Sequence, residues 1–212
     1  MKKVVLSILT LIFFSTLRAQ ELKPATGEQQ QAMIEKITDA SSKMKSLCCD
    51  FEQVKELSIL DEKMVSKGKM NYRQDSRLRW EYLEPYAYIF MLNDRKLLMQ
   101  TGNSRNVMDV KSSKMFQEIV KIMMNSINGK GLNEIDSFDN KYFLYGNNWI
   151  VKLIPIQKEI KKIFSGIELT FNTKDYTVDK VKLVEQNGDN TIILLSSKQF
   201  NKEIEDTVFH ID

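Results

Sequence analysis

Few side chains in this sequence are suited to catalysis or metal binding. His210 is the only histidine, and the two cysteines, Cys48 and Cys49, are adjacent in the chain. A Ser-His-acid or Cys-His mechanism would need His210, which lies in a short predicted strand at the C-terminal end, a poor position for a general base. One histidine and two adjacent cysteines also cannot form a usual zinc site. We therefore expect no catalytic residue, no metal site, no cofactor and no enzymatic activity.

Two alternatives remain open from the residues alone. Carboxylate-only catalysis, as in glycosidases, is compatible with the many Asp and Glu side chains, because spacing does not show whether any two share a cleft. Neighbouring residues of a strand point to opposite faces, which predicts two separate thiols at Cys48 and Cys49. A strained vicinal disulfide or an intermolecular disulfide is the alternative for this pair.

The N-terminus has the composition of a secretory signal peptide. Lys2 and Lys3 precede an apolar run of eleven residues, and Ala19 offers a small residue for cleavage. An uncleaved membrane anchor is the alternative, although the run is short for a membrane span. We therefore expect residues 1–19 to be a signal peptide and residues 20–212 to form a single exported domain.

Removing the predicted signal peptide makes the chain neutral. Lys2, Lys3 and Arg18 are three of the 31 basic residues, so 28 basic and 28 acidic side chains remain. A neutral surface with interspersed charges is a poor electrostatic match for nucleic acid. We therefore exclude nucleic acid as a partner.

Hydrophobic periodicity predicts a mainly β protein with two sizeable helices. Thr26 and Gln29 form a capping-box pattern before a helix predicted over 27–45, and a second apolar helical stripe ends near Gly129. Period-two segments predict strands at 48–57, 64–73, 77–83, 87–92, 96–100, 106–110, 141–145, 148–155, 166–172, 176–186, 191–201 and 207–211, with a helical turn or hairpin end within 156–164. The economical arrangement is a curved antiparallel sheet or barrel with helices on its concave side.

The stretch SRLRWEYLEP, from Ser76 to Pro85, has one charged and one apolar face. In an extended chain its Arg and Glu side chains point to one side, and Leu78, Trp80 and Tyr82 point to the other. Eight of the eleven methionines lie between Met64 and Met124, which is typical of a surface for varied apolar partners or of gap filling in a core. The apolar face is therefore either sheet core or the wall of a cavity.

The order of these segments resembles the periplasmic outer-membrane lipoprotein carriers, the LolA-like family. The matching pieces are DFEQ, SKGKM, LRWEYLEP, MLNDRKLLMQ, the helix closed by NGKGL, WIVKLIP, the GIELTF and VDKVKLVEQNGD hairpin, and Asn201 with Phe209. The resemblance covers essentially all of Leu22 to Asp212. It implies an α+β, mainly β fold, an incomplete antiparallel barrel of about eleven strands with helices as a lid.

The resemblance also implies a function. A LolA-like carrier lies in the periplasm, receives acylated lipoproteins from an inner-membrane lipoprotein-releasing ABC transporter, and delivers them to an outer-membrane acceptor. We expect this chain to do the same as a monomer. A lipid or lipoprotein sensor or binding module of the same architecture is the alternative.

One-sided periodicity and the resemblance together predict the wall of the lipid cavity. The predicted lipid-binding residues are Met70, Leu78, Trp80, Tyr82, Ile89, Met91, Met99, Phe116, Ile119 and Met123. The arginine by which the family latches its lid falls on Gln74 when the sequences are aligned on Trp80 and Pro85. Gln74 could donate the same hydrogen bonds, more weakly because it is uncharged.

Overall fold

The computed structural model describes residues 21–60, 62–112, 114–128, 132 and 137–211. The predicted signal peptide, residues 1–19, lies outside them. The sheet contains β1 (Lys23–Pro24), β2 (Ser46–Glu56), β3 (Lys63–Arg73), β4 (Arg77–Glu84), β5 (Tyr88–Asn93), β6 (Lys96–Thr101), β7 (Ser104–Asp109), β8 (Phe138–Tyr145), β9 (Asn148–Pro155), β10 (Phe164–Asn172), β11 (Val178–Glu185) and β12 (Asn190–Phe200). The helices are α1 (Gly27–Lys43), α2 (Lys114–Asn128), α3 (Lys158–Lys161) and the 3-10 turns η1 (Val110–Ser112) and η2 (Asp206–Phe209).

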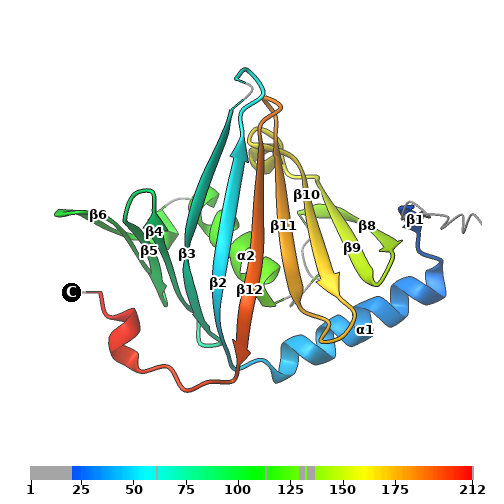
Figure 1. The fold of residues 1–212 in the computed structure, drawn as a ribbon, viewed down its shortest axis with the longest axis horizontal. Helices are drawn as coiled ribbons and strands as arrows, with labels where there is room; N and C mark the ends of the chain where they lie inside the picture. Colours follow the sequence, from blue (N-terminus) through cyan, green and yellow to red (C-terminus); the bar gives the residue numbers. More distant parts are fainter. Residues whose placement is uncertain (1–20, 61, 113, 129–131, 133–136, 212) are drawn as a thin grey trace, which may run out of the picture.

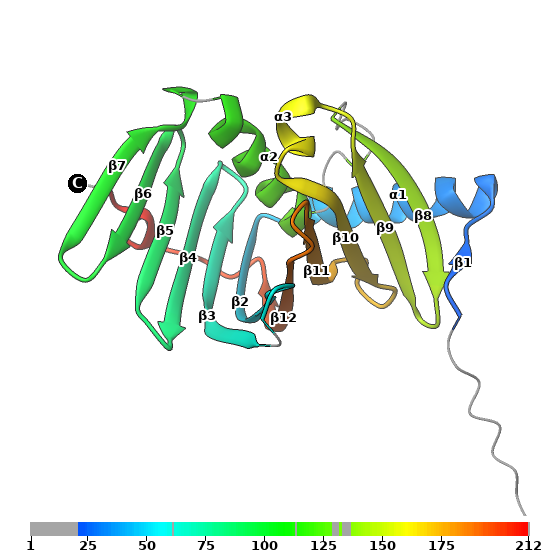
Figure 2. The same cartoon turned by 90° about the horizontal axis from the view of Figure 1, so that it is seen from above.

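All twelve strands form one antiparallel sheet in the order β1-β8-β9-β10-β11-β12-β2-β3-β4-β5-β6-β7. Consecutive strands pair from β2 to β7 and from β8 to β12, whereas the pairings of β12 with β2 and of the short β1 with β8 join segments that are far apart in the sequence. The sheet is therefore open, with β1 at one edge (Figure 1) and β7 at the other (Figure 2), and this confirms the predicted mainly β fold as an incomplete barrel.

The sheet is strongly curved, and the helices α1 and α2 lie on its concave side (Figure 2). The chain leaves β7 at one edge and re-enters the sheet at β8 near the other edge, so α2 crosses the concave side between them. Side chains of α1 and α2, such as Met33, Ile37 and Ile122, pack with β9 and β10 residues in one core cluster. The concave face therefore forms the main core of the molecule.

Several local predictions are confirmed. At the start of α1, the Thr26 hydroxyl accepts from the Gln29 N–H and the Gln29 amide oxygen accepts from the Thr26 N–H, which is a complete capping box. The NGD turn joins β11 to β12, with Gly188 at φ +90°. Residues 158–161 form the helical turn α3.

The predicted strand at 207–211 is wrong. Residues Asp206–Phe209 form the 3-10 turn η2, which lies against the convex face of β4 and β5. Phe209 is fully buried there with Met91, Leu98 and Ile204. The apolar residues of this segment therefore pack on the sheet without joining it.

Candidate functional site: an apolar pocket beneath α2

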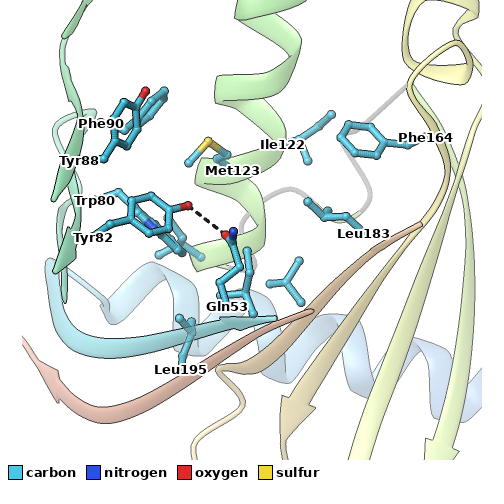
Figure 3. Close-up of a pocket in the computed structure, with 13 residues that line it drawn as sticks. Gln53, Trp80, Tyr82, Tyr88, Phe90, Ile122, Met123, Phe164, Leu183 and Leu195 are labelled. Carbon is cyan, nitrogen blue, oxygen red and sulfur yellow. Dashed lines mark hydrogen bonds between the residues drawn. The ribbon is translucent and has the colours of Figure 1, made fainter. Parts of the chain in front are cut away.

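A pocket of about 270 Å³ lies between α2 and the concave face of the sheet, and we call it the α2 pocket (Figure 3). Strands from both halves of the sheet and α2 supply its walls. Its lining residues are Gln53, Trp80, Tyr82, Tyr88, Phe90, Ile122, Met123, Ile127, Phe164, Val181, Leu183, Ile193 and Leu195.

One wall of the α2 pocket is aromatic, and strand register explains its composition. Trp80 pairs with Phe90 and Tyr82 pairs with Tyr88 across β4 and β5, so all four side chains point to the concave face. Phe51 of β2 lies behind them, with its ring centroid 4.5 Å from that of Trp80 and 5.0 Å from that of Tyr82. These rings pack against one another and form a continuous apolar surface.

Gly68 of β3 makes this aromatic packing possible. It lies between Phe51 on β2 and Tyr82 on β4 in the strand register. A Cβ atom at this position would lie 2.6 Å from the Phe51 ring and would also overlap the Glu81 carbonyl oxygen. The absence of a side chain therefore lets the Phe51 ring cross β3 toward Trp80 and Tyr82.

The opposite wall is aliphatic apart from Phe164 and comes from the second half of the sheet. Val181 pairs with Ile193 across β11 and β12, and Ile193 pairs with Gln53 of β2. The pairing of β12 with β2 thus joins the two walls through Ile193 and Gln53, which are 140 positions apart in the sequence.

Helix α2 closes the pocket with Ile122, Met123 and Ile127. Val120, Met123 and Met124 also pack against the aromatic half of the core, and Ile122 packs against the other half. These contacts are apolar and non-directional, so other apolar groups could replace them.

Three of the predicted wall residues, Trp80, Tyr82 and Met123, line the α2 pocket. Met70 and Leu78 share the concave face but are 0% and 1% exposed within the core cluster, so they support the wall from behind. Met99 pairs with Phe90 and so belongs to the same face, outside the lining set. Phe116 and Ile119 lie on α2, but their side chains are outside the described part of the chain.

The placement of Ile89 and Met91 on the cavity wall is corrected. Phe90 points to the concave face, so its neighbours on β5 point to the convex face. Met91 is buried there against Leu98 and Phe209, with Ile89 beside them. Both faces of β5 carry apolar side chains, and both are covered by other parts of the protein. The core and α2 cover the concave face, and the C-terminal segment covers the convex face.

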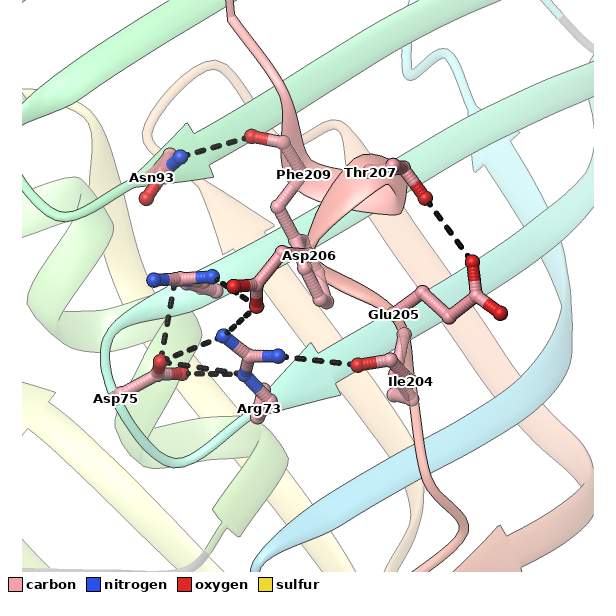
Figure 4. Close-up of polar contacts among 9 residues, drawn as sticks. Arg73, Asp75, Asn93, Ile204, Glu205, Asp206, Thr207 and Phe209 are labelled. Carbon is pink, nitrogen blue, oxygen red and sulfur yellow. Dashed lines mark hydrogen bonds and ion pairs between the residues drawn. The ribbon is translucent and has the colours of Figure 1, made fainter.

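The C-terminal segment is fixed to the convex face by a network of charges (Figure 4). Arg73 and Arg77 each form ion pairs with both Asp75 and Asp206, with N–O distances between 2.6 and 3.1 Å. Arg73 also donates to the Ile204 carbonyl oxygen, and Asn93 donates to that of Phe209. Hydrogen bonds from Arg73 hold the pKa values of both Asp75 and Asp206 below the ordinary value. The charged face of SRLRWEYLEP thus helps to hold this segment.

Gln74 lies in the exposed turn between β3 and β4. Its backbone N–H donates to the Lys45 carbonyl oxygen, and its side chain makes no hydrogen bond to any residue that the structure describes. Latching of the helical lid through this position therefore remains a prediction.

Reactive groups lie away from the α2 pocket. Cys48 and Cys49 are both free and belong to clusters on opposite faces of β2. Burial raises the pKa of Cys49 to about 12, so this thiol stays protonated and unreactive. His210 is exposed on the C-terminal segment. Within the described ranges, no group of His, Cys, Asp and Glu could hold a metal ion, and no helix has the length and apolar character needed to cross a membrane.

None of the second wall, and only part of the first wall and of α2, was predicted from the sequence. The residues missed are Gln53, Tyr88, Phe90, Ile122, Ile127, Phe164, Val181, Leu183, Ile193 and Leu195. The period-two pattern of β11 and β12 shows which of their side chains share a face. It does not show that this face lies opposite β4, because that depends on the pairing of β12 with β2.

Comparison with known proteins gives one family match. The family model described as "Outer membrane lipoprotein carrier protein LolA" matches residues 42–212. A search of the curated proteins finds no match to this sequence.

Several solved structures are similar to this chain. An uncharacterized conserved protein from Thermus thermophilus is 9% identical, with 86% of this chain and 94% of that chain covered at a TM-score of 0.52. A LolA superfamily protein from Nitrosomonas europaea is 10% identical, with 85% and 97% covered and a TM-score of 0.48. The lipoprotein LppX of Mycobacterium tuberculosis is 9% identical, with 85% and 99% covered and a TM-score of 0.48.

Proposed function

Because the chain belongs to the outer membrane lipoprotein carrier family, LolA, we propose that it binds the acyl chains of lipoproteins in the α2 pocket and carries them across the periplasm to the outer membrane. In this role it acts as a monomer, receives its cargo from an inner-membrane lipoprotein-releasing ABC transporter, and passes it to an outer-membrane acceptor.

The observation that carries the proposal is the composition of the α2 pocket. Nine of its thirteen lining side chains are Phe, Ile, Leu, Val or Met, and none carries a carboxylate, amine, imidazole or thiol. Such a lining offers no group for covalent or general acid–base chemistry other than two tyrosine hydroxyls, whose pKa values are raised by burial. It favours binding of an apolar guest over catalysis.

The size of the pocket bears on how a lipoprotein would be held. If a methylene group takes about the volume of a water molecule, roughly 30 Å³, then 270 Å³ accommodates about nine methylenes. At ~0.8 kcal/mol for each, these would contribute about 7 kcal/mol. A triacylated anchor with some forty methylenes would cost on the order of 30 kcal/mol if left bare in water. Full loading therefore requires more space than the pocket provides in this structure.

Outward movement of α2 would provide that space. The helix packs on the sheet through Val120, Met123, Met124 and Ile127, and acyl chains could replace these apolar contacts with little loss. The surface beneath α2 would then bind either the helix or the cargo. Such an exchange suits a carrier, which must hold its cargo and also release it.

The proposal can be tested by filling the pocket. Leu183 lines it, and Leu183→Trp should occupy much of the space, whereas Lys182→Trp places the same side chain on the opposite face of β11 as a control. Incubated with spheroplasts, the wild-type protein and Lys182→Trp should release lipoproteins into solution and hold them in a complex detectable by mass spectrometry. Leu183→Trp, with an unchanged circular dichroism spectrum, should release less than a tenth as much.

Release by Leu183→Trp at the wild-type level would contradict the assignment of the cargo to this pocket. Failure of the wild-type protein to release any lipoprotein, together with co-purification of a free lipid, would instead support the binding or sensing alternative.

A further inference from the structure

The polar groups of the α2 pocket are gathered on one wall. Gln53, Trp80, Tyr82 and Tyr88 are the lining residues with a polar side-chain atom, and they come from β2, β4 and β5 in the same half of the sheet. The wall formed by β10, β11 and β12 is entirely apolar. A guest would therefore meet hydrogen-bonding groups at one side only.

These groups have unused hydrogen-bond donors. The Tyr82 hydroxyl donates to the Gln53 amide oxygen at 2.9 Å, which leaves the Gln53 NH₂ group without a described partner (Figure 3). Trp80 is only 6% exposed, and its indole N–H makes no hydrogen bond to a described residue. The Tyr82 hydroxyl lies near this N–H, and their interaction opposes part of the rise in the pKa of Tyr82 that burial causes, but the two groups do not have the geometry of a hydrogen bond.

A buried N–H without a partner is unfavourable, and native structures rarely contain one. The Trp80 N–H and the Gln53 NH₂ both lie beside the Tyr82 hydroxyl and can only donate. No cation lines the pocket, so a buried carboxylate would find no opposite charge. The best match is an apolar chain that ends in an uncharged acceptor oxygen.

We propose that Gln53 and Trp80 bind the carbonyl oxygen of an ester at the head of an acyl chain, while the chain itself lies against the aliphatic wall. This inference rests on the proposed function, because it assigns a polar contact to an acyl group already held in the α2 pocket. It adds a specificity: an ester-linked chain binds more tightly than an ether-linked chain of the same length.

Two small lipids test this specificity. 1-Decanoylglycerol and 1-O-decylglycerol have the same chain length, suited to a pocket of about 270 Å³, and differ only in the carbonyl group. Isothermal titration calorimetry of the wild-type protein should give about a tenfold lower Kd for the ester, or ~1.4 kcal/mol. In Gln53→Leu and in Trp80→Phe, which each remove one donor, the ratio of the two Kd values should fall to about threefold or less. Glu52→Gln, on the opposite face of β2, is the control and should keep the tenfold ratio.

A spectroscopic measurement tests the Trp80 contact separately. Trp149 is the other tryptophan of the chain, so Trp149→Phe leaves Trp80 as the sole indole. A hydrogen bond from its N–H should shift the fluorescence to longer wavelength with the ester and not with the ether.

The outcomes separate the two proposals. If both lipids bind the wild-type protein equally well, the carbonyl contact is wrong while acyl binding stands. If the ester is preferred but Gln53→Leu and Trp80→Phe keep the full preference, other groups bind the carbonyl and the inference is also wrong. If neither lipid binds, acyl binding in this pocket fails, and the inference fails with it.

Discussion

The two faces of β4 and β5 differ in what covers them. On the concave face, Trp80 and Phe90 line a pocket of about 270 Å³. On the convex face, Met91 is covered by Phe209, which is 0% exposed, and the arginines of β3 and β4 form ion pairs with Asp206. The convex face is covered by the protein's own C-terminal segment, whereas the concave face contains an unfilled pocket.

This difference indicates which face serves stability and which serves binding. Protein interiors are close-packed, and unfilled apolar space costs stability. On the convex face the C-terminal segment fills the apolar space. Ion pairs and hydrogen bonds to carbonyl oxygens are directional contacts, and they hold this segment in one position on the sheet. The concave face has mostly non-directional contacts, which can be exchanged for those of a guest. We therefore expect substitutions on the two faces to have separable effects.

The largest effect is expected from Phe209→Ala. Truncation of this fully buried ring should lower the free energy of unfolding by about 3–5 kcal/mol, measured by urea denaturation. Because Phe209 is outside the α2 pocket, the Kd of the folded protein for 1-decanoylglycerol should stay within twofold of the wild-type value. Glu203→Ala, an exposed position of the same segment, is the control. A large change in Kd would show that the two faces are not separable.

An intermediate effect is expected from Gly68→Ala on the concave side. The added methyl group overlaps the Phe51 ring and the Glu81 carbonyl oxygen, so the free energy of unfolding should fall by about 1–3 kcal/mol. Displacement of Phe51 should also disturb Trp80 and Tyr82 and weaken binding of 1-decanoylglycerol.

Gly166→Ala is the matched control for Gly68→Ala. Its nearest neighbour to a new Cβ atom is the Leu153 carbonyl oxygen at 3.9 Å, an ordinary contact. This variant should keep wild-type stability and binding. If Gly68→Ala also kept wild-type stability and binding, the proposed role of Gly68 in the aromatic wall would be contradicted.

The smallest effect is expected from acid. Hydrogen bonds from Arg73 lower the pKa values of Asp75 and Asp206 in the folded protein, so their contribution to stability is present above the unfolded value of about 3.9. It is lost as the pH falls through the lower folded values. The difference in unfolding temperature between the wild-type protein and Asp206→Asn should therefore be present at pH 7 and shrink below about pH 4. A difference as large at pH 3 as at pH 7 would exclude this cause.

Several features of the molecule depend on local sequence. The alternation in β4 places Leu78, Trp80 and Tyr82 on one face, and the Thr26 and Gln29 pair marks the start of α1. These predictions succeeded because side-chain direction in a strand and capping at a helix start depend on residues a few positions apart. The scarcity of His and Cys can also be read from composition alone, and the absence of enzymatic activity stays a prediction.

Other features could not be predicted in this way. The strand β5 is apolar on both faces, so its pattern did not show that Phe90 faces the pocket while Met91 faces the C-terminal segment. The apolar residues of the C-terminal segment suggested a strand, but its Phe209 instead fills a site on the convex face. In both cases the answer depends on which distant segment covers the residue.

The amino-acid sequence by itself therefore determined most of the elements of this protein and the alternation of side chains along each strand, because these follow from short-range geometry. Only the tertiary structure decided which face became a pocket. The pairing of β12 with β2 brings Ile193 next to Gln53, and the crossing of α2 covers the space between the two walls. These are long-range contacts, and the side-chain alternation of a single strand is the same whether its apolar face meets a helix, a chain terminus or a ligand.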